Sequence, residues 1–104
     1  MIDLEKIEGF DWEAGNDRKS GDKHQVSQAE VEQVFFHVPL VLALDVKHSQ
    51  TESRFHALGK TAAGRLLHIT FTLRFDGRKI RPISARDMHR KERRVYEAST
   101  QANP

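Results

Sequence analysis

Residues 65–75 carry the pattern that most constrains the fold, an unbroken alternation of apolar and polar side chains over the length of a β-strand. Asp76-Gly77 follows directly, and this pair favours a two-residue type I′ turn, so the chain should double back as a β-hairpin. The chain is therefore expected to build an antiparallel sheet. On the predicted strand, one face carries Leu67, Ile69, Phe71, Leu73 and Phe75, and the other carries His68, Thr70, Thr72 and Arg74.

Three further segments extend the expected sheet. Residues 78–86 form the returning strand, in which Pro82 cannot donate a ladder hydrogen bond, so the strand lies at an edge or carries a bulge there. Upstream, leucines alternate in residues 38–44, and a polar loop leads to a second strand at residues 54–59. Small residues at 60–64 supply the next turn. The pattern predicts a four-stranded antiparallel meander.

One helix is expected before this sheet. Ser27 and Glu30 have the spacing of a capping box, and Val26 and Val31 occupy the hydrophobic-staple positions. The helix should present Val31, Val34 and Phe35 on one face and end before Pro39.

The ends of the chain are expected to be helical or irregular. Residues 87–99 should form a closing helix that carries Met88, Glu92, Val95 and Tyr96 on one face, with a frayed tail at 100–104. Residues 1–11 suggest a short strand or arm, and the polar segment 13–25 has weak helix propensity. The prediction is one small α+β domain over residues 1–104, with N-terminal helices, the four-stranded antiparallel sheet and a C-terminal helix.

Composition excludes several functional classes. With 104 residues and no cysteine, the chain has no disulfide framework, no thiolate zinc site and no cysteine nucleophile. No apolar run approaches the length of about 20 residues that a membrane span needs. The N-terminus lacks the features of a signal peptide, so a soluble, cytoplasmic protein without membrane contact is expected.

Charge is divided unevenly along the chain. Residues 1–52 contain five Lys/Arg and eleven Asp/Glu, a balance of −6, and residues 53–104 contain twelve Lys/Arg and four Asp/Glu, a balance of +8. The basic half fits a polyanion or an acidic protein surface, although a solvated face is an equally valid interpretation.

A candidate catalytic group lies on the strand that begins near Glu52. Period-two geometry puts Glu52, Arg54 and His56 on the face opposite Phe55 and Ala57. A base, a cation and an acid are the groups that cleave RNA by internal attack of a 2′-hydroxyl on phosphorus. The competing interpretation is a surface ion pair beside an exposed histidine.

Two arginines of the last strand and one glutamate of the closing helix form a second group. Arg81 and Arg86 have the guanidinium fork that suits phosphate, and Glu92 on its half-buried helix face needs a cationic partner such as Arg86 or Arg54. A structural ion pair between helix and sheet explains Glu92 equally well. The six histidines have no metal-ligand spacing, and no phosphate-binding glycine loop is present, so we expect no metal and no cofactor.

An ordered series of motifs resembles the BrnT family of toxins from type II toxin–antitoxin modules, over Phe10 to Glu97. The segments that carry the resemblance are Phe10-Asp11-Trp12, Lys23-His24 with the helix to Phe35, the polar loop from Asp45 to Glu52, Arg54-Phe55-His56-Ala57-Leu58-Gly59, Gly64-Arg65-Leu66-Leu67, Arg81-Pro82-Ile83-Ser84-Ala85-Arg86 and Glu92-Arg93-Arg94-Val95-Tyr96-Glu97.

The resemblance implies a RelE-like ribonuclease fold, translation arrest by RNA cleavage, and neutralisation by a BrnA-type antitoxin. Operator DNA would be bound only through that antitoxin. Because the sequence has no metal-ligand spacing, we expect this cleavage to be metal-independent. The catalytic candidates are Arg54, Arg86, Glu52, Glu92 and Tyr96. The RNA-binding candidates are Lys23, His24 and Arg81, to which the basic cluster adds Arg78 and Lys79.

A second hypothesis comes from three departures from the family pattern. Asn16, Ser20 and Gln25 stand where the family usually has lysine, asparagine and glycine. If those positions help to form the RNA site, the chain is a non-catalytic relative that acts as a binding or regulatory partner.

Overall fold

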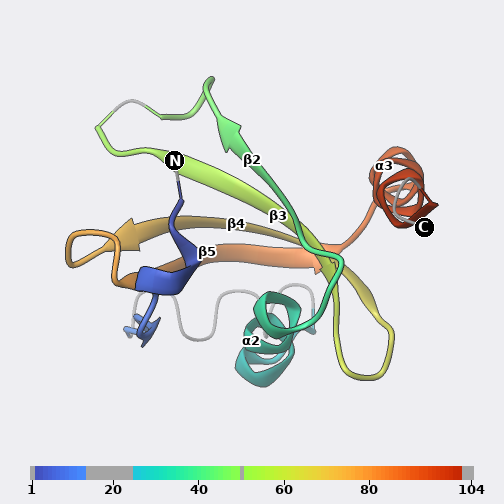
Figure 1. Cartoon of the computed structure of the whole chain (residues 1–104), viewed down its shortest axis with the longest axis horizontal. Helices are drawn as coiled ribbons and strands as arrows, with labels where there is room; N and C mark the ends of the chain where they lie inside the picture. Colours follow the sequence, from blue (N-terminus) through green and yellow to red (C-terminus); the bar gives the residue numbers. More distant parts are fainter. Residues whose placement is uncertain (1, 14–24, 50, 102–104) are drawn as a thin grey trace.

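The computed structural model describes residues 2–13, 25–49 and 51–101 as an α+β arrangement of five strands, two α-helices and one short 3-10 helix (Figure 1). In chain order, the elements are η1 (Leu4–Lys6), β1 (Gly9–Phe10), α2 (Gln28–Phe36), β2 (Val41–Asp45), β3 (Arg54–Lys60), β4 (Leu66–Arg74), β5 (Lys79–Asp87) and α3 (Arg90–Gln101).

The sheet has the strand order β1-β5-β4-β3-β2. Strands β2 to β5 pair antiparallel in sequence order, which confirms the predicted meander. The expectation of a purely antiparallel, four-stranded sheet is wrong, because β1 adds a fifth strand parallel to β5. Only Gly9 and Phe10 pair in this strand, and a contact that short and that distant in sequence leaves no periodic signal.

The β4–β5 hairpin closes around Asp76-Gly77, as predicted, but the connection has four residues, 75–78, instead of two, because the ladder ends at the pair Arg74–Lys79. The amide of Arg78 donates to the Phe75 carbonyl (3.2 Å), and Asp76 and Gly77 have φ values of 60° and 82°, which a type I′ turn requires. Phe75 departs from its predicted place on the apolar face. Its φ is 54° and its side chain is 60% exposed, because the turn draws this residue out of the strand.

A bulge interrupts β5 at the predicted proline. Phe71 pairs with Pro82, whereas the preceding Thr70 pairs with Ser84, so Ile83 is an extra residue on β5. As a result, Arg81 and Arg86, which are five positions apart, lie on the same face of the sheet.

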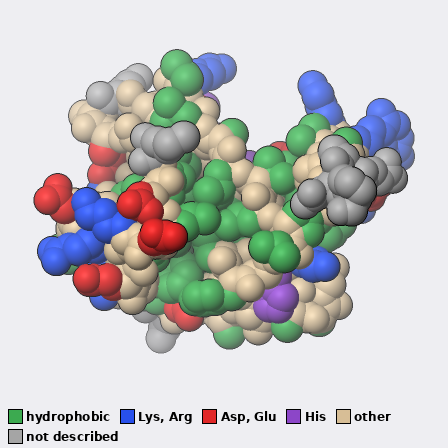
Figure 2. All heavy atoms as spheres, in the orientation of Figure 1, with side chains coloured by type: hydrophobic (Ala, Val, Ile, Leu, Met, Phe, Trp, Pro, Cys, Tyr) green, Lys and Arg blue, Asp and Glu red, His purple; other side chains and the backbone are tan. Residues whose placement is uncertain are grey.

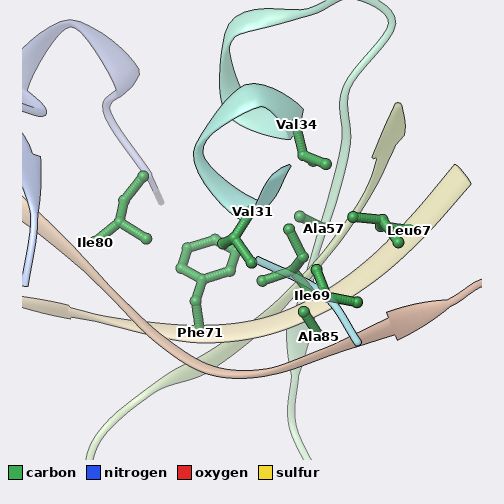
Figure 3. Packing of buried hydrophobic residues seen from close by; sticks show 9 residues of the cluster. Val31, Val34, Ala57, Leu67, Ile69, Phe71, Ile80 and Ala85 are labelled. Atoms are coloured by element: carbon green, nitrogen blue, oxygen red, sulfur yellow. The ribbon is translucent and has the colours of Figure 1, made fainter. Parts of the chain in front are cut away.

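Helix α2 covers the other face and forms the main core. The predicted capping box is present, with the Glu30 amide donating to Ser27 Oγ (3.1 Å) and the Ser27 amide donating to Glu30 Oε1 (3.0 Å). Figure 3 shows Val31 and Val34 of α2 pointing toward the sheet. The buried residues of this cluster are Val26, Val31, Val34, Ala57, Leu67, Ile69, Phe71, Ile80 and Ala85.

Helix α3 packs on the opposite face, over one end of the sheet. Met88 and Tyr96 form a second small core with Leu58 of β3. Glu92 and Tyr96 face the sheet as predicted, but Val95 is 50% exposed. The helix continues to Gln101, so Thr100 and Gln101 are helical and do not belong to a frayed tail as predicted; residues 102–104 lie outside the described part of the chain.

Helices α2 and α3 leave parts of both sheet faces open. Figure 2, in the orientation of Figure 1, shows hydrophobic side chains gathered along the centre of one view, with acidic and basic groups at its left side. On the face that carries α3, the residues packed with that helix are Leu58, Val41 and Leu66, and the strand residues farther along the same face, such as Arg54, His56 and Thr70, are mostly polar. That polar surface brings most of the candidate groups together.

Candidate active site on the open sheet face

The face of the sheet that carries α3 is built of three cross-strand rows, which the ladder register fixes. We call it the open face. The first row is Asp45, Arg54, Thr72 and Arg81, the second is Ala43, His56, Thr70 and Ser84, and the third is Val41, Leu58, His68 and Arg86. Helix α3 packs on the apolar part of the third row, so the polar first and second rows form a surface beside the helix.

A hollow of about 390 Å³ lies over these two rows. It is lined by Asp45, His48, Arg54, His56, Thr70, Ile83 and Ser84. The half-buried guanidinium of Arg54 makes no hydrogen bond or ion pair with any described residue, whereas Arg74, Arg81 and Arg86 are each ion-paired. The hollow thus holds a cation whose charge is available to an anion.

The turn after β2 places an acid and a histidine beside Arg54. Ser49 ties the two strands together, because its hydroxyl donates to the Asp45 carbonyl and accepts the Arg54 amide hydrogen (2.9 Å). Asp45 Oδ2 lies 2.9 Å from His48 Nδ1 and 2.9 Å from His56 Nε2. Partial burial of Asp45 opposes ionisation, but the hydrogen bonds from the His48 ring and backbone keep the pKa of this carboxyl below its usual value.

An ion pair joins the third row to α3. Arg86 donates to both oxygens of Glu92, at 2.8 and 2.9 Å, and the His89 amide also donates to Glu92 Oε1 (2.8 Å). These hydrogen bonds lower the pKa of Glu92 to about 2 against the opposing effect of burial.

His68 lies beside this ion pair and under α3. Its Nε2 is 3.8 Å from Glu92, and its ring centroid is 4.7 Å from that of His56. Burial, together with the charge of Arg86, lowers the pKa of His68 to about 4, so this imidazole is neutral at pH 7.

Two other predicted catalytic residues lie outside the hollow. Glu52 is ion-paired with Arg74 on the exposed end of the sheet. Tyr96 is 3% exposed, and its hydroxyl donates to the Pro39 carbonyl (2.8 Å), which fastens α3 to the segment before β2. Burial raises the pKa of this phenol.

Three of the five predicted RNA-binding residues belong to β5 or to the turn before it, and the other two lie outside the described residues. Arg81 is ion-paired with Asp11 and Glu13, both at 3.3 Å, and Arg78 donates to the Phe75 carbonyl in the hairpin. Lys79 is half-buried next to Gly9. Lys23 and His24, like Asn16 and Ser20, lie outside the described residues, whereas Gln25 is exposed and its carbonyl accepts a hydrogen bond from Arg65.

Asp45 and His48 are absent from the candidates derived from the sequence, and they form the most connected polar group of the hollow. Their signal was an acid followed three residues later by histidine, at the point where a strand enters a polar loop. Periodicity is uninformative in loops, so this spacing alone did not distinguish the pair from surface residues.

Within residues 2–13, 25–49 and 51–101, no three His, Asp or Glu side chains converge as metal ligands would. In the same residues, no helix has the length and apolar character to cross a membrane.

Comparison with known families gives one match. A family model described as the ribonuclease toxin BrnT of a type II toxin–antitoxin system matches residues 12–92, which include every lining residue of the hollow. No curated protein matches the chain.

Proposed function

Because the chain belongs to the BrnT family of type II toxin–antitoxin ribonuclease toxins, we propose that it binds and cleaves RNA in the hollow around Arg54. The observation that carries this proposal is the Arg54 guanidinium, which lies among polar side chains and makes no ion pair with any described residue. A guanidinium that makes no ion pair within the protein can bind a phosphate without first breaking such a pair.

The chemistry we propose is internal attack. The 2′-oxygen of a ribose forms a bond to the adjacent phosphorus while the bond from phosphorus to the 5′-oxygen breaks, giving a 2′,3′-cyclic phosphate and a 5′-hydroxyl. Negative charge increases on the non-bridging oxygens in the transition state, and the planar fork of Arg54 matches two such oxygens. The nucleophile belongs to the substrate, so the reaction we propose needs proton transfer and a cation and does not depend on a divalent metal.

The remaining candidates take supporting roles in this proposal. Arg86 and Glu92 act as one ion-paired unit that joins α3 to the sheet. Tyr96 anchors the same helix through Pro39, and Glu52 keeps Arg74 at the rim.

Phosphates that flank the cleaved bond would contact basic residues on either side of the hollow. The candidates on the strand side are Arg78, Lys79 and Arg81. Lys23 and His24 remain candidates from the sequence alone, since they lie outside the described residues. On the helix side, α3 presents four exposed cations, Arg90, Lys91, Arg93 and Arg94. Such contacts position the RNA without selecting its sequence.

We propose that the antitoxin is of the BrnA type and that an acidic segment of it covers this basic surface. The complex, through the antitoxin, would bind operator DNA, and the free toxin would arrest translation. A type II antitoxin is a protein, so neutralisation by direct contact with the open face is the simplest arrangement that fits the charges.

The test is RNA cleavage by the purified chain in excess chelator, with a single-stranded oligonucleotide as substrate. We expect fragments that end in a 2′,3′-cyclic phosphate. Arg54→Ala should lower the rate about a hundredfold, the typical effect of removing one donor to a developing oxyanion. Lys6→Ala makes the same change in charge on an exposed residue of η1 that does not line the hollow, and it should have much less effect on the rate.

Two results would contradict the proposal. Arg54→Ala that cuts RNA as fast as the unmodified protein would remove this hollow as the site. An unmodified protein that neither cuts RNA nor stops growth when expressed without antitoxin would favour the non-catalytic relative.

A further inference from the structure

The Asp45 carboxylate holds two imidazoles, and the two differ in what their second nitrogen does. His56 has both nitrogens engaged, with Nε2 at 2.9 Å from Asp45 Oδ2 and Nδ1 at 3.2 Å from Thr70 Oγ1. His48 has only Nδ1 engaged, at 2.9 Å from the same carboxylate oxygen. The side chain of His56 is 33% exposed, and that of His48 is 59% exposed.

The backbone fixes the position of His48 as well as its ring. The His48 amide donates to Asp45 Oδ1 (3.2 Å), and the His48 ring contacts Asp45 Oδ2. The carboxylate therefore binds both the backbone and the side chain of His48. The Asp45 carboxylate can accept a hydrogen bond from the His48 ring only if the neutral ring carries its proton on Nδ1. That tautomer leaves a lone pair on Nε2. The depressed pKa of Asp45 keeps this acceptor ionised at neutral pH.

We propose that His48 is the general base of RNA cleavage and that Asp45 is its positioning residue. His48 lines the hollow together with Arg54, so its Nε2 and the guanidinium can act on one bound phosphodiester. The proposal rests on the ribonuclease function proposed above and adds the group that accepts the proton. Other titratable groups that face this position are Asp45 and His56.

The step balances without a further reagent. The proton of the 2′-hydroxyl moves to His48 Nε2 as the 2′-oxygen bonds to phosphorus, and the leaving 5′-oxygen takes a proton from water. The imidazolium that forms is stabilised through Nδ1–H by the Asp45 carboxylate, an arrangement that other hydrolytic enzymes also use.

The first experiment compares rates for the full chain with a single-stranded RNA oligonucleotide. Loss of a general base costs 10²- to 10⁴-fold, so His48→Ala should lower kcat by about that factor and leave KM nearly unchanged. Free imidazole in the buffer should restore part of the lost rate. The acidic limb of the pH dependence of kcat should disappear in the variant, which a purely structural role for His48 would not cause.

Two matched variants complete the comparison. His89→Ala removes another exposed histidine, whose side chain lines no part of the hollow, and should keep the normal pH profile. Asp45→Asn should lose rate without rescue by imidazole, because the ring is present but no longer held in the active tautomer. Nitrogen-15 NMR of the histidine rings should show the Nδ1–H tautomer of His48 in the unmodified protein and its loss in Asp45→Asn.

A substrate with sulfur in place of the bridging 5′-oxygen separates base from acid. Sulfur leaves without protonation, so His48→Ala should stay slow on this substrate if His48 is the base. A normal rate on it would assign His48 as the acid and overturn the proposal. A normal kcat of His48→Ala on ordinary RNA would also overturn the proposal. An Nε2–H tautomer of His48 in the unmodified protein would do the same. An unmodified protein that cuts no RNA would instead overturn the ribonuclease function itself.

Discussion

Replacing Glu92 by glutamine should lower the free energy of unfolding by about 3 kcal/mol at pH 7. The value follows from the pKa of Glu92, which falls from 4.5 to about 2 in the folded protein through the Arg86 and His89 hydrogen bonds. Each pKa unit corresponds to about 1.4 kcal/mol of preference for the ionised form. The Glu92 side chain is 23% exposed, so solvent screens this preference only in part.

The loss should depend on pH in a defined way. The folded pKa lies below the unfolded one, so the ionised carboxylate stabilises the fold above pH 4.5 and that stabilisation disappears as pH falls toward 2. At pH 3 the difference between the unmodified protein and Glu92→Gln should shrink to about 1.5 kcal/mol. Unfolding in urea, followed by fluorescence of the single tryptophan Trp12, measures both values.

The control is Glu97→Gln, the same chemical change on an exposed residue of α3, which should alter stability by less than about 0.5 kcal/mol. A Glu92→Gln loss below that amount at pH 7, or one that is equally large at pH 3, would refute the reasoning. A variant with normal stability and no RNA cleavage would place Glu92 in the chemistry instead.

Three further predictions concern packing, pH and association. A Cβ on Gly59 would lie 2.6 Å from Val34 Cγ1, so Gly59→Ala should cost about 1–3 kcal/mol in urea unfolding; unchanged stability would mean that α2 shifts freely. The folded pKa of His68, about 4, lies below the ordinary 6.5, so the folded state binds fewer protons and stability should fall by up to about 3 kcal/mol between pH 6.5 and 4, with a flatter profile in His68→Gln. The association rate with antitoxin should fall as salt rises, because the basic half steers an acidic partner; a rate independent of salt in stopped-flow mixing would exclude such steering.

Local signals accounted for most of the fold. The alternation in β4, the Asp76-Gly77 turn and the Ser27–Glu30 capping box each act within a few residues, and each appears where the sequence places it. The short strand suggested within residues 1–11 is present as β1, but its parallel pairing with β5 could not be predicted, because two residues held by contacts about 70 positions away carry no period. The placement of Phe75 on the apolar face of the strand was wrong for a related reason. The alternation of apolar and polar residues continues to Phe75, whereas the strand ends at Arg74 and the turn begins.

The candidate site was likewise predicted only in the part that depends on local strand geometry. Strand geometry was enough to put Arg54 on the open face and to suggest that Glu92 pairs with Arg86. The partner of the Tyr96 hydroxyl is a carbonyl 57 residues earlier, and the contact of Asp45 with His56 spans a loop. Both depend on how the chain returns, which side-chain periodicity does not record.

The bulge at Ile83 affects which side chains of β5 lie on the same face of the sheet. In a regular strand, residues an odd number of positions apart point to opposite sides, so Arg81 and Arg86 share a side only because one residue lies outside the ladder. Deleting Ile83 would leave the two arginines four positions apart, and a regular strand would then keep both on the open face. Straightening the bulge without a deletion would instead turn one of them into the apolar layer that contains Phe71, where a guanidinium without a partner costs several kcal/mol. Deletion of Ile83 should therefore preserve the placement of both arginines, and an engineered library that varies the length of this strand would show whether the bulge itself is needed.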